Sequence, residues 1–400
     1  MIEIQGKRNS AIVFAEKIDR ETKTQLAELL RDIAFSDSII RIMPDTHYGK
    51  GCVVGTTMTI NGRLCPALIG VDIGCGMETV VLDEKEVDLR RLDELIHAKI
   101  PSGSKVHANP LPAAEELDLS MLRCYSKINA DRAYRSIGTL GGGNHFIELD
   151  KDDDGTLYLV IHSGSRQLGS DVAKFYQDAA YRYQCKKARK SIRSASYERY
   201  TEDVDYGAKP IRHERQKNQT TGVIHARAVL DGELFNDYIH DISIVRRFAD
   251  LNRQAMANTI IDSLGLSKKE RFSNVHNYVD TDRMILRKGA VSANQGERII
   301  IPLNMRDGAL ICTGLGNPEW NFSAPHGAGR VGSRTDVKYA YSVEEFAEQM
   351  KGIYSTTVNA GTIDECPMAY KKPTSIISLI GDTVNIEKTI RPVYNFKASN

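Results

Sequence analysis

The sequence lacks several features that would define its class at once. Its 400 residues contain seven cysteines but no CxxC pair, which excludes a structural zinc finger and a secreted disulfide framework. No apolar run approaches the roughly 18 residues that a membrane span needs, and no apolar signal segment opens the chain. Basic and acidic residues are nearly balanced, 53 against 52, so any nucleic-acid site must be a local patch. We therefore expect a cytoplasmic protein with no membrane contact.

Short apolar runs that end in glycine-rich turns dominate the first third of the chain and residues 283–334. They are typical of buried strands, and examples are CVVGTTMTI, LCPALIGVDI, LYLVIHSG and GALICTGLG. Apolar residues at three- and four-residue spacing predict helices over residues 170–190, 237–265 and 342–355. Because these elements follow no regular βαβ rhythm, we expect an α+β fold. One compact domain over residues 1–400 would combine packed mixed β-sheets with surrounding helices.

Residues 185–225 differ from the rest because they are polar, charged and without a strong apolar period. Basic residues crowd into the start of this segment: Lys186, Lys187, Arg189, Lys190, Arg193 and Arg199. A charged insertion of this kind is compatible with a solvated helix end and surface loop. It is also compatible with a surface arm that contacts phosphates. The sequence leaves both interpretations open.

Metal-binding residue types recur in one setting, where a short apolar run meets glycine or a small polar residue. They are Asp72 and Cys75 in GVDIGCGM, His145 in GGGNHFIE, His162 in LVIHSGSR, His276 in VHNY and His326 in SAPHGAGR. A lone histidine at a strand end usually belongs to the core or the surface, but four of them beside an Asp-x-x-Cys turn predict a metal site. One thiolate, one carboxylate and several imidazoles suit Mn, Fe, Co or Zn rather than Mg or Ca. Because a thiolate can bridge, the spacing fits one ion or two.

His326 stands in HGAGR, a turn with two glycines and an arginine, and Ser333 and Arg334 follow closely. Backbone N–H groups and guanidinium groups are suited to polyphosphates and to anionic transition states. A histidine in this setting can ligate a metal, act as an acid or base, or attack phosphorus directly. The residues alone leave all three roles open.

Seven motifs follow one another along the chain: MPDTHYGKG, GVDIGCGM, GTLGGGNHFIE, IHSGSRQLG, VHNY, RKGA and HGAGRVGSR. The series resembles that of the RtcB family of RNA ligases, and the resemblance runs from Met43 to Lys397. It implies an RtcB-type domain with two Mn²⁺ ions and GTP as cofactors. Cys75 would bridge the two ions. Asp72 and His145 would complete the protein ligands of one ion, and His162 and His276 those of the other.

The resemblance also implies a reaction in RNA repair or tRNA splicing. His326 would attack the α-phosphate of GTP, forming a histidine–GMP bond and releasing pyrophosphate. An RNA 3′-phosphate, if necessary formed first by opening a 2′,3′-cyclic phosphate, would accept the GMP, and a 5′-hydroxyl would displace it. The implied nucleotide contacts are Asn144, Glu148, Asn304, His326, Gly327, Ala328, Gly329, Tyr370 and Lys397. Expected RNA contacts near the metal site are Arg166, Lys288, Arg330 and Arg334.

One segment departs from the family pattern. Where a PGSM-type loop is expected, the chain reads PLNMRDGA, so that Asn304 and Ala309 replace hydroxyl side chains that usually help to hold the nucleotide. The metal and nucleophile positions are intact, and we therefore expect an active enzyme of a divergent branch. Two alternatives use the same residues differently. One is a metal-dependent phosphodiesterase or phosphatase, and the other is an RNA-binding relative that has lost catalysis.

Overall fold

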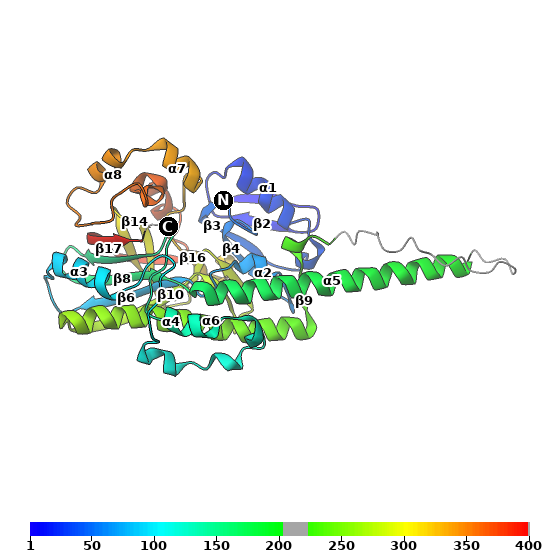
Figure 1. The fold of residues 1–400 in the computed structure, drawn as a ribbon. Helices are drawn as coiled ribbons and strands as arrows, with labels where there is room; N and C mark the ends of the chain where they lie inside the picture. The colour runs from blue at the N-terminus through cyan, green and yellow to red at the C-terminus, as the bar shows by residue number, and fades with distance from the viewer. Residues whose placement is uncertain (203–222, 399–400) are drawn as a thin grey trace.

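The strands form two main sheets in the computed structural model, which describes residues 1–202 and 223–398, with side chains omitted for 191–202 (Figure 1). The larger sheet is antiparallel throughout, with its strands in the order β10-β6-β8-β7-β17-β15-β14. In that order they are β10 (Lys268–Val275), β6 (Gly76–Leu82), β8 (Leu157–Ser163), β7 (Phe146–Lys151), β17 (Val384–Lys397), β15 (Gly308–Gly314) and β14 (Arg298–Asn304).

The second sheet contains the N-terminal strands, and only its β2–β3 pair is parallel. Its strands are, in order, β1 (Ile2–Gln5), β2 (Ser10–Val13), β3 (Ile40–His47), β4 (Val54–Thr59), β12 (Ile285–Lys288) and β11 (Asn277–Asp280). Two small ribbons complete the strands: β13 (Ala290–Ser292) with β16 (Ser323–Pro325), and β5 (Arg63–Leu64) with β9 (Leu230–Asp231).

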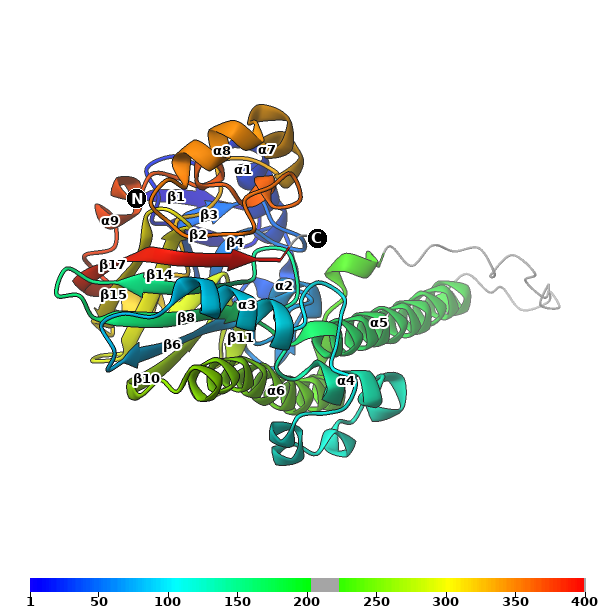
Figure 2. The ribbon, with the colours of Figure 1, turned by 60° about the vertical axis from the view of Figure 1, so that its left-hand side comes forward.

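Two long helices lie side by side along the base of the molecule, and one of them, α5, projects far beyond the body (Figures 1 and 2). The helices are α1 (Arg20–Leu29), α2 (Pro66–Ile69), α3 (Leu89–Lys99), α4 (Ala130–Ser136), α5 (Arg166–Glu202), α6 (Gly232–Leu264), α7 (Arg334–Ala340), α8 (Val343–Gln349) and α9 (Thr374–Ile377). Among the described helices, none combines the length and apolar character that a membrane crossing requires.

Both faces of the central strands of the larger sheet are buried. On one face, Ile147 and Ile161 pack in a cluster with Met256 of α6 and with residues of α3. On the other face, Phe146 joins a cluster that includes residues of β14 and β15. Every residue of β6 and β8 is therefore buried, which explains why these strands appear in the sequence as continuous apolar runs.

The structure confirms the α+β fold and most of the expected elements. CVVGTTMTI contains β4, LYLVIHSG contains β8 and GALICTGLG contains β15. The helix expected over 170–190 lies within α5, and the one expected over 237–265 corresponds to α6, which ends at Leu264 with Gly265 as its C-cap. The strand expected for LCPALIGVDI is wrong beyond Leu64. Pro66 occupies the first turn of α2, where its fixed φ and missing N–H favour a helix start over a strand.

Two expectations near charged or glycine-containing segments need adjustment. The helix predicted over 342–355 ends at Gln349, because Gly352 turns the chain with φ of 90°. The basic segment expected over 185–225 begins as the continuation of α5, which remains helical as far as Glu202. Residues 203–222 of that segment lie outside the described residues.

Candidate active site

Four of the expected metal ligands meet at one end of the larger sheet. Cys75 directly precedes β6, His145 directly precedes β7, His162 is the penultimate residue of β8, and His276 directly follows β10. In an antiparallel sheet the start of one strand lies beside the end of its neighbour. Gly76 accordingly pairs with both Ser163 and Val275, and Phe146 pairs with His162. The sheet register alone therefore gathers residues that are far apart in the sequence.

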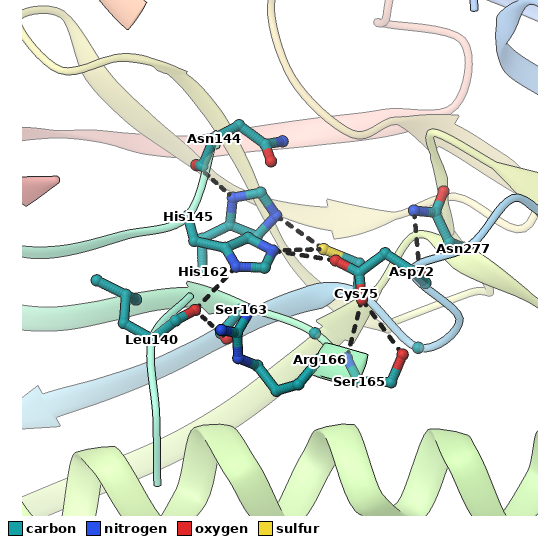
Figure 3. Close-up of polar contacts among 12 residues, drawn as sticks. Asp72, Cys75, Leu140, Asn144, His145, His162, Ser163, Ser165, Arg166 and Asn277 are labelled. Carbon is teal, nitrogen blue, oxygen red and sulfur yellow. Dashed lines mark hydrogen bonds and ion pairs between the residues drawn. The ribbon is translucent and has the colours of Figure 1, made fainter. Parts of the chain in front are cut away.

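The side chains converge as the strands do (Figure 3). Cys75 Sγ lies 3.3 Å from His162 Nε2 and 3.6 Å from His145 Nε2. His145 Nε2 lies 3.1 Å from Asp72 Oδ2, and His162 Nε2 lies 3.4 Å from His276 Nε2. Two groups of potential ligand atoms result, each within 4.8 Å: Asp72, Cys75 and His145, and Cys75, His162 and His276. Cys75 belongs to both groups, so the arrangement could hold two ions that share a thiolate.

Backbone carbonyl groups orient two of these imidazoles. His145 Nδ1 lies 2.8 Å from the carbonyl oxygen of Leu140, and His162 Nδ1 lies 3.0 Å from that of Asn144. A protonated Nδ1 donating to each carbonyl leaves the Nε2 lone pair directed at the cluster, which is the form that binds metal. His276 Nδ1 is buried without a hydrogen-bond partner among the described residues.

Burial sets the protonation states in the cluster. It lowers the pKa of His162 and His276 far below the ordinary histidine value, and neighbouring histidines lower it further. Burial would raise the pKa of Asp72, but its contacts with His145 and with the backbone N–H of Ser165 outweigh burial and hold that pKa well below its usual range. The cluster thus offers neutral imidazoles at His162 and His276 and an ionised carboxylate at Asp72, as a transition metal requires.

The thiol is different. Burial and the nearby charge of Asp72 raise the pKa of Cys75 well above its usual value. A cation bound between Cys75 and Asp72 would reverse the local field and stabilise the thiolate. The donor set therefore fits Mn, Fe, Co or Zn. Without a bound cation, the buried thiol of Cys75 beside the charged Asp72 would be an unfavourable arrangement.

A glycine next to the cluster makes room for Asp72. Asp72 Oδ1 accepts hydrogen bonds from the backbone N–H of Ser165, at 2.9 Å, and from its hydroxyl, at 3.2 Å. A Cβ atom on Gly164 would lie only 2.1 Å from Asp72 Oδ1. Glycine at 164 therefore allows the carboxylate to reach the backbone that orients it.

Helix α6 ties the ligand-bearing loops together through two buried polar side chains. The guanidinium group of Arg253 donates to the carbonyl oxygens of Gly74, at 2.8 Å, and Ser163, at 2.9 Å. The amide of Asn252 donates to the carbonyl oxygen of Gly164, at 3.0 Å. Both side chains are completely buried. The turn that carries Cys75 and the strand end that carries His162 are thus fixed to one helix.

His326 lies directly beside the cluster, with its ring centroid 4.9 Å from that of His276. Its Nδ1 lies 2.7 Å from Oδ2 of Asp45, a completely buried residue of β3. This contact orients the imidazole ring and leaves Nε2 free, as a histidine that attacks phosphorus or acts as a base would require. Gly329 has φ of 77°, and a Cβ atom there would lie 2.2 Å from the carbonyl oxygen of Asp45. The turn that contains Gly329 and the strand that contains Asp45 therefore pack too closely for any side chain at position 329.

The cluster and His326 open into one cavity of about 840 Å³. All the nucleotide contacts expected from the sequence lie on its wall: Asn144, Glu148, Asn304, His326, Gly327, Ala328, Gly329, Tyr370 and Lys397. The expected RNA contacts Lys288, Arg330 and Arg334 also line it, but Arg166 does not. The guanidinium group of Arg166 instead donates to the carbonyl oxygen of Gly103, at 2.7 Å.

Glu365 gathers the cations of the cavity around one buried carboxylate. It pairs with Lys397 at 2.9 Å, with Arg330 at 3.1 Å and with Arg334 at 2.5 Å. Tyr370 donates its hydroxyl to the same carboxylate at 2.5 Å. Burial opposes ionisation, but the three positive charges hold the pKa of Glu365 at about 2. We call these five residues the Glu365 cluster.

A second carboxyl group in the cavity, Glu148, is less strongly paired. It accepts a hydrogen bond from the amide of Asn395 at 2.6 Å. Burial raises the pKa of Glu148 to about 7, while the charge of Lys397 works against that rise. Asp150 is completely buried two residues further along β7, and neither of its carboxyl oxygens has a partner among the described residues. Glu148 can therefore change protonation state near neutral pH.

The PLNMRDGA segment carries its two unusual residues to different places. The side-chain amide of Asn304 donates to Asp307, at 2.8 Å, and its oxygen accepts from the backbone N–H groups of Arg306 and Asp307. This amide is thus largely committed to its own turn. Ala309 packs in the core with residues of β7 and β8 and does not line the cavity. A hydroxyl side chain at position 309 would therefore face the core and not the cavity.

Sequence reasoning missed three groups that shape the site. Asp45 was within reach, because it stands in the motif MPDTHYGKG, but nothing in that motif distinguishes it from a turn residue. Glu365 lies in a segment without a recognisable pattern. Asn252 and Arg253 interrupt the apolar spacing of a predicted helix as an adjacent polar pair, which is a weak signal of buried polar contacts.

These features define a protein with a candidate transition-metal centre at the end of a sheet, beside an oriented histidine and a cavity whose wall carries several cations. The family described as tRNA-splicing ligase RtcB matches residues 27–123 and 113–398. The chain therefore belongs to the RtcB family. It is 29% identical to the RNA-splicing ligase RtcB of Escherichia coli strain K12, over 94% of each chain. It is 26% identical to the tRNA-splicing ligase RtcB of Aeropyrum pernix, over 91% of this chain and 89% of the relative.

The raised pKa of Cys75 predicts proton release on metal binding. Because the thiol is protonated at neutral pH and a metal ligand must be a thiolate, Mn²⁺ should displace about one proton per protein. Calorimetric titration in two buffers of different ionisation enthalpy measures that number. Cys75→Ser should bind more weakly and release no proton, whereas Cys312→Ser, at a buried cysteine outside the cluster, should behave as the wild type. Equal release from the Cys75 variant would contradict the assignment.

The close approach of Gly164 to Asp72 predicts a selective defect. In Gly164→Ala the new methyl group must displace the Asp72 carboxylate, so Mn²⁺ affinity should fall roughly 10- to 100-fold while the protein remains folded. Gly381→Ala is the matched control, since a Cβ there meets nothing within 4 Å. Metal titration with circular dichroism of both variants tests this. Wild-type affinity in Gly164→Ala would show that Asp72 is not a ligand.

Proposed function

We propose that this protein joins RNA ends through a guanylylated histidine, using GTP and two Mn²⁺ ions. Membership of the RtcB family and the names of its relatives support an RNA ligase. The observation that carries the finer proposal is the pair formed by His326 and buried Asp45 beside the candidate metal centre. An Asp–His pair can also act as a general base in a hydrolase, so the match to a family of RNA ligases is what favours a covalent histidine intermediate here. The names of the family and its relatives support a role in tRNA splicing, and we further propose that the protein acts in the cytoplasm, in RNA repair or tRNA splicing.

Two ions would be held by the residues that the sheet gathers. Asp72, Cys75 and His145 would hold one, and Cys75, His162 and His276 the other. When bound, such ions offset negative charge on a phosphate and help to orient it for in-line attack. The protein contributes the fixed donor set, since hydrogen bonds from the imidazole Nδ1 atoms and from Ser165 hold the ligands in place.

His326 carries the covalent step. With Nδ1–H donating to Asp45, Nε2 attacks the α-phosphorus of GTP, a P–N bond forms, and pyrophosphate leaves with the broken P–O bond. As Nε2 becomes bonded, the imidazole gains positive charge, and the Asp45 carboxylate stabilises it in a buried setting. The guanine base would lie against Glu148, whose ionised form accepts two N–H groups, and against Tyr370.

The RNA steps reuse the same cavity. An oxygen of the RNA 3′-phosphate attacks the phosphorus of the histidine–GMP bond, and the imidazole leaves. A 5′-hydroxyl oxygen then attacks the RNA phosphate, GMP leaves, and a phosphodiester remains. A 2′,3′-cyclic phosphate must first be opened by water. Among the cations on the cavity wall, Lys288, Arg330 and Arg334 are the ones we expect to neutralise these phosphates.

Replacing His326 by Gln should abolish GMP attachment while metal affinity is retained, because His326 is outside the ligand set. The measurement is covalent labelling with α-labelled GTP and Mn²⁺, together with sealing of 3′-phosphate RNA. Sealing should fail in His326→Gln with ordinary RNA and return with RNA that already carries a 3′-guanylyl cap. A Cys75→Ala variant should fail with both substrates.

These labelling and sealing assays separate the ligase proposal from its alternatives. A phosphodiesterase or phosphatase would never accept label from GTP and would release phosphate or open cyclic ends instead. A catalytically inactive RNA-binding protein would show neither reaction. Label that persists in His326→Gln would place the nucleophile at another residue.

The pKa of Glu148 predicts a pH-dependent affinity for GTP. Below about pH 7 the carboxyl is protonated and cannot accept both guanine N–H groups; above it the ionised group can. The KM for GTP in the labelling reaction should therefore fall as pH rises from about 6 to 8. Glu148→Gln, which cannot ionise, should have a higher KM and lose this dependence. An unchanged profile in the variant would mean that another group titrates.

A further inference from the structure

The helix that begins at the candidate metal centre leaves the body as a basic arm. Ser165 holds Asp72, and α5 begins at the next residue, Arg166. The helix is one continuous element to Glu202, and both views show its distal half projecting from the body (Figures 1 and 2). At about 1.5 Å per residue, Arg182 lies roughly 24 Å and Glu202 roughly 54 Å from the start of the helix.

Packing anchors the first half of α5. Tyr176 is buried and donates its hydroxyl to Asp241 of α6 at 2.8 Å. Gln184 donates to the carbonyl oxygen of Val229 at 3.1 Å, and Lys187 pairs with Asp231 at 3.2 Å. The distal half is therefore the extension of a fixed element, so its orientation relative to the candidate metal centre is fixed as well.

The arm, residues 182–202, carries a net charge opposite in sign to that of the rest of the chain. Residues 182–202 contain seven basic and two acidic residues, a net charge of +5. Since the whole chain carries +1, the remaining residues together carry −4. A segment that concentrates positive charge on an otherwise acidic protein is a local patch for a polyanion.

Three of the exposed cations of the arm follow one face. Arg182, Lys186 and Arg189 are exposed, stand at i, i+4 and i+7, and have no carboxylate partner among the described residues. In the sequence the same spacing continues to Arg193, and Tyr197 comes four residues later. Tyr183 is also exposed on the arm, and Lys187 Nζ lies 5.8 Å from its ring centroid.

We propose that this stripe of Arg182, Lys186 and Arg189 binds the phosphate backbone of a structured RNA whose ends are in the active site. The stripe has spaced cations, as a phosphate backbone requires, and exposed tyrosine nearby. A membrane surface would instead require a wide apolar face opposite the cations, and residues 182–202 contain Ile192 as their one large aliphatic residue. Because the stripe lies tens of ångströms from the centre, it contacts RNA remote from the joined ends. The proposal rests on the proposed ligase function.

The test compares charge reversal on the stripe with matched reversal elsewhere. The stripe variant is R182E/K186E/R189E. The control is K7E/K268E/K269E, which changes the net charge equally at three exposed lysines outside α5. The probes are a 3′-phosphate RNA hairpin with a stem of about 16 base pairs, and short single strands that cannot span the roughly 24 Å to Arg182. Affinity is measured between about 50 and 200 mM salt.

We expect the stripe variant to bind the hairpin at least tenfold more weakly at the lowest salt. Its slope of log affinity against log salt should be shallower by about 2 to 3, near 0.9 for each lost phosphate contact. GMP labelling and sealing of short strands should stay as in the wild type, and the control should behave as the wild type in every assay. Wild-type affinity and slope in the stripe variant would overturn the proposal. So would stripe-dependent sedimentation with anionic phospholipid vesicles without any change in RNA binding.

Failure of the ligase proposal has a different signature. If the wild type accepts no GMP and seals no RNA, the ligase function is wrong whatever the arm binds. If the wild type seals RNA and the stripe variant loses neither hairpin affinity nor salt slope, only the arm proposal is wrong.

Discussion

The candidate site depends on one buried contact, the grip of Arg253 on the carbonyl oxygens of Gly74 and Ser163. Strand pairing brings the ends of β6 and β8 together, but a sheet fixes its strands better than the turns beyond them. A planar guanidinium group with several donors in a rigid fork can hold two turns at once. Because a charged group donates to carbonyl oxygens in the interior, the contact is both strong and costly to lose, and the carboxylate of Asp250 pairs with the same guanidinium group. The neighbouring Asn252 extends the grip to Gly164, against which Asp72 is packed.

Much of this arrangement could be predicted from the sequence, because strand ends and glycines have clear local causes. The runs that contain β4, β8 and β15 were recognisable from composition, and the α+β class followed from the order of elements. LCPALIGVDI misled because its apolar letters resemble a strand, whereas Pro66 determines the backbone. The spacing of the residues predicted a metal site but did not decide between one ion and two. The family resemblance implied a partition into two groups that share Cys75, and the sheet register brings the side chains together in those two groups.

The parts of the site that escaped prediction depend on long-range contacts. Asp45 and His326 are 281 residues apart, and no periodicity connects β3 with the turn after β16. Glu365 lies in a short irregular segment, and its role in the site depends on ion pairs with three cations from other parts of the chain. Asn304 shows the opposite limit. Its residue type suggested a nucleotide contact, but a turn of four residues satisfies most of its hydrogen-bonding capacity before any ligand arrives.

The Glu365 cluster gives the cavity a built-in counter-ion. Lys397, Arg330 and Arg334 face a cavity that would otherwise attract any small anion in the cell, but each already has a carboxylate within ion-pair distance. A free phosphate or chloride offers these cations little beyond what they have, because it exchanges one negative partner for another and must lose its own hydration. A ligand gains only if it brings further contacts along with its charge. The Glu365 cluster thus disfavours the binding of small free anions, while its cations remain available to a larger ligand that also contacts other parts of the cavity.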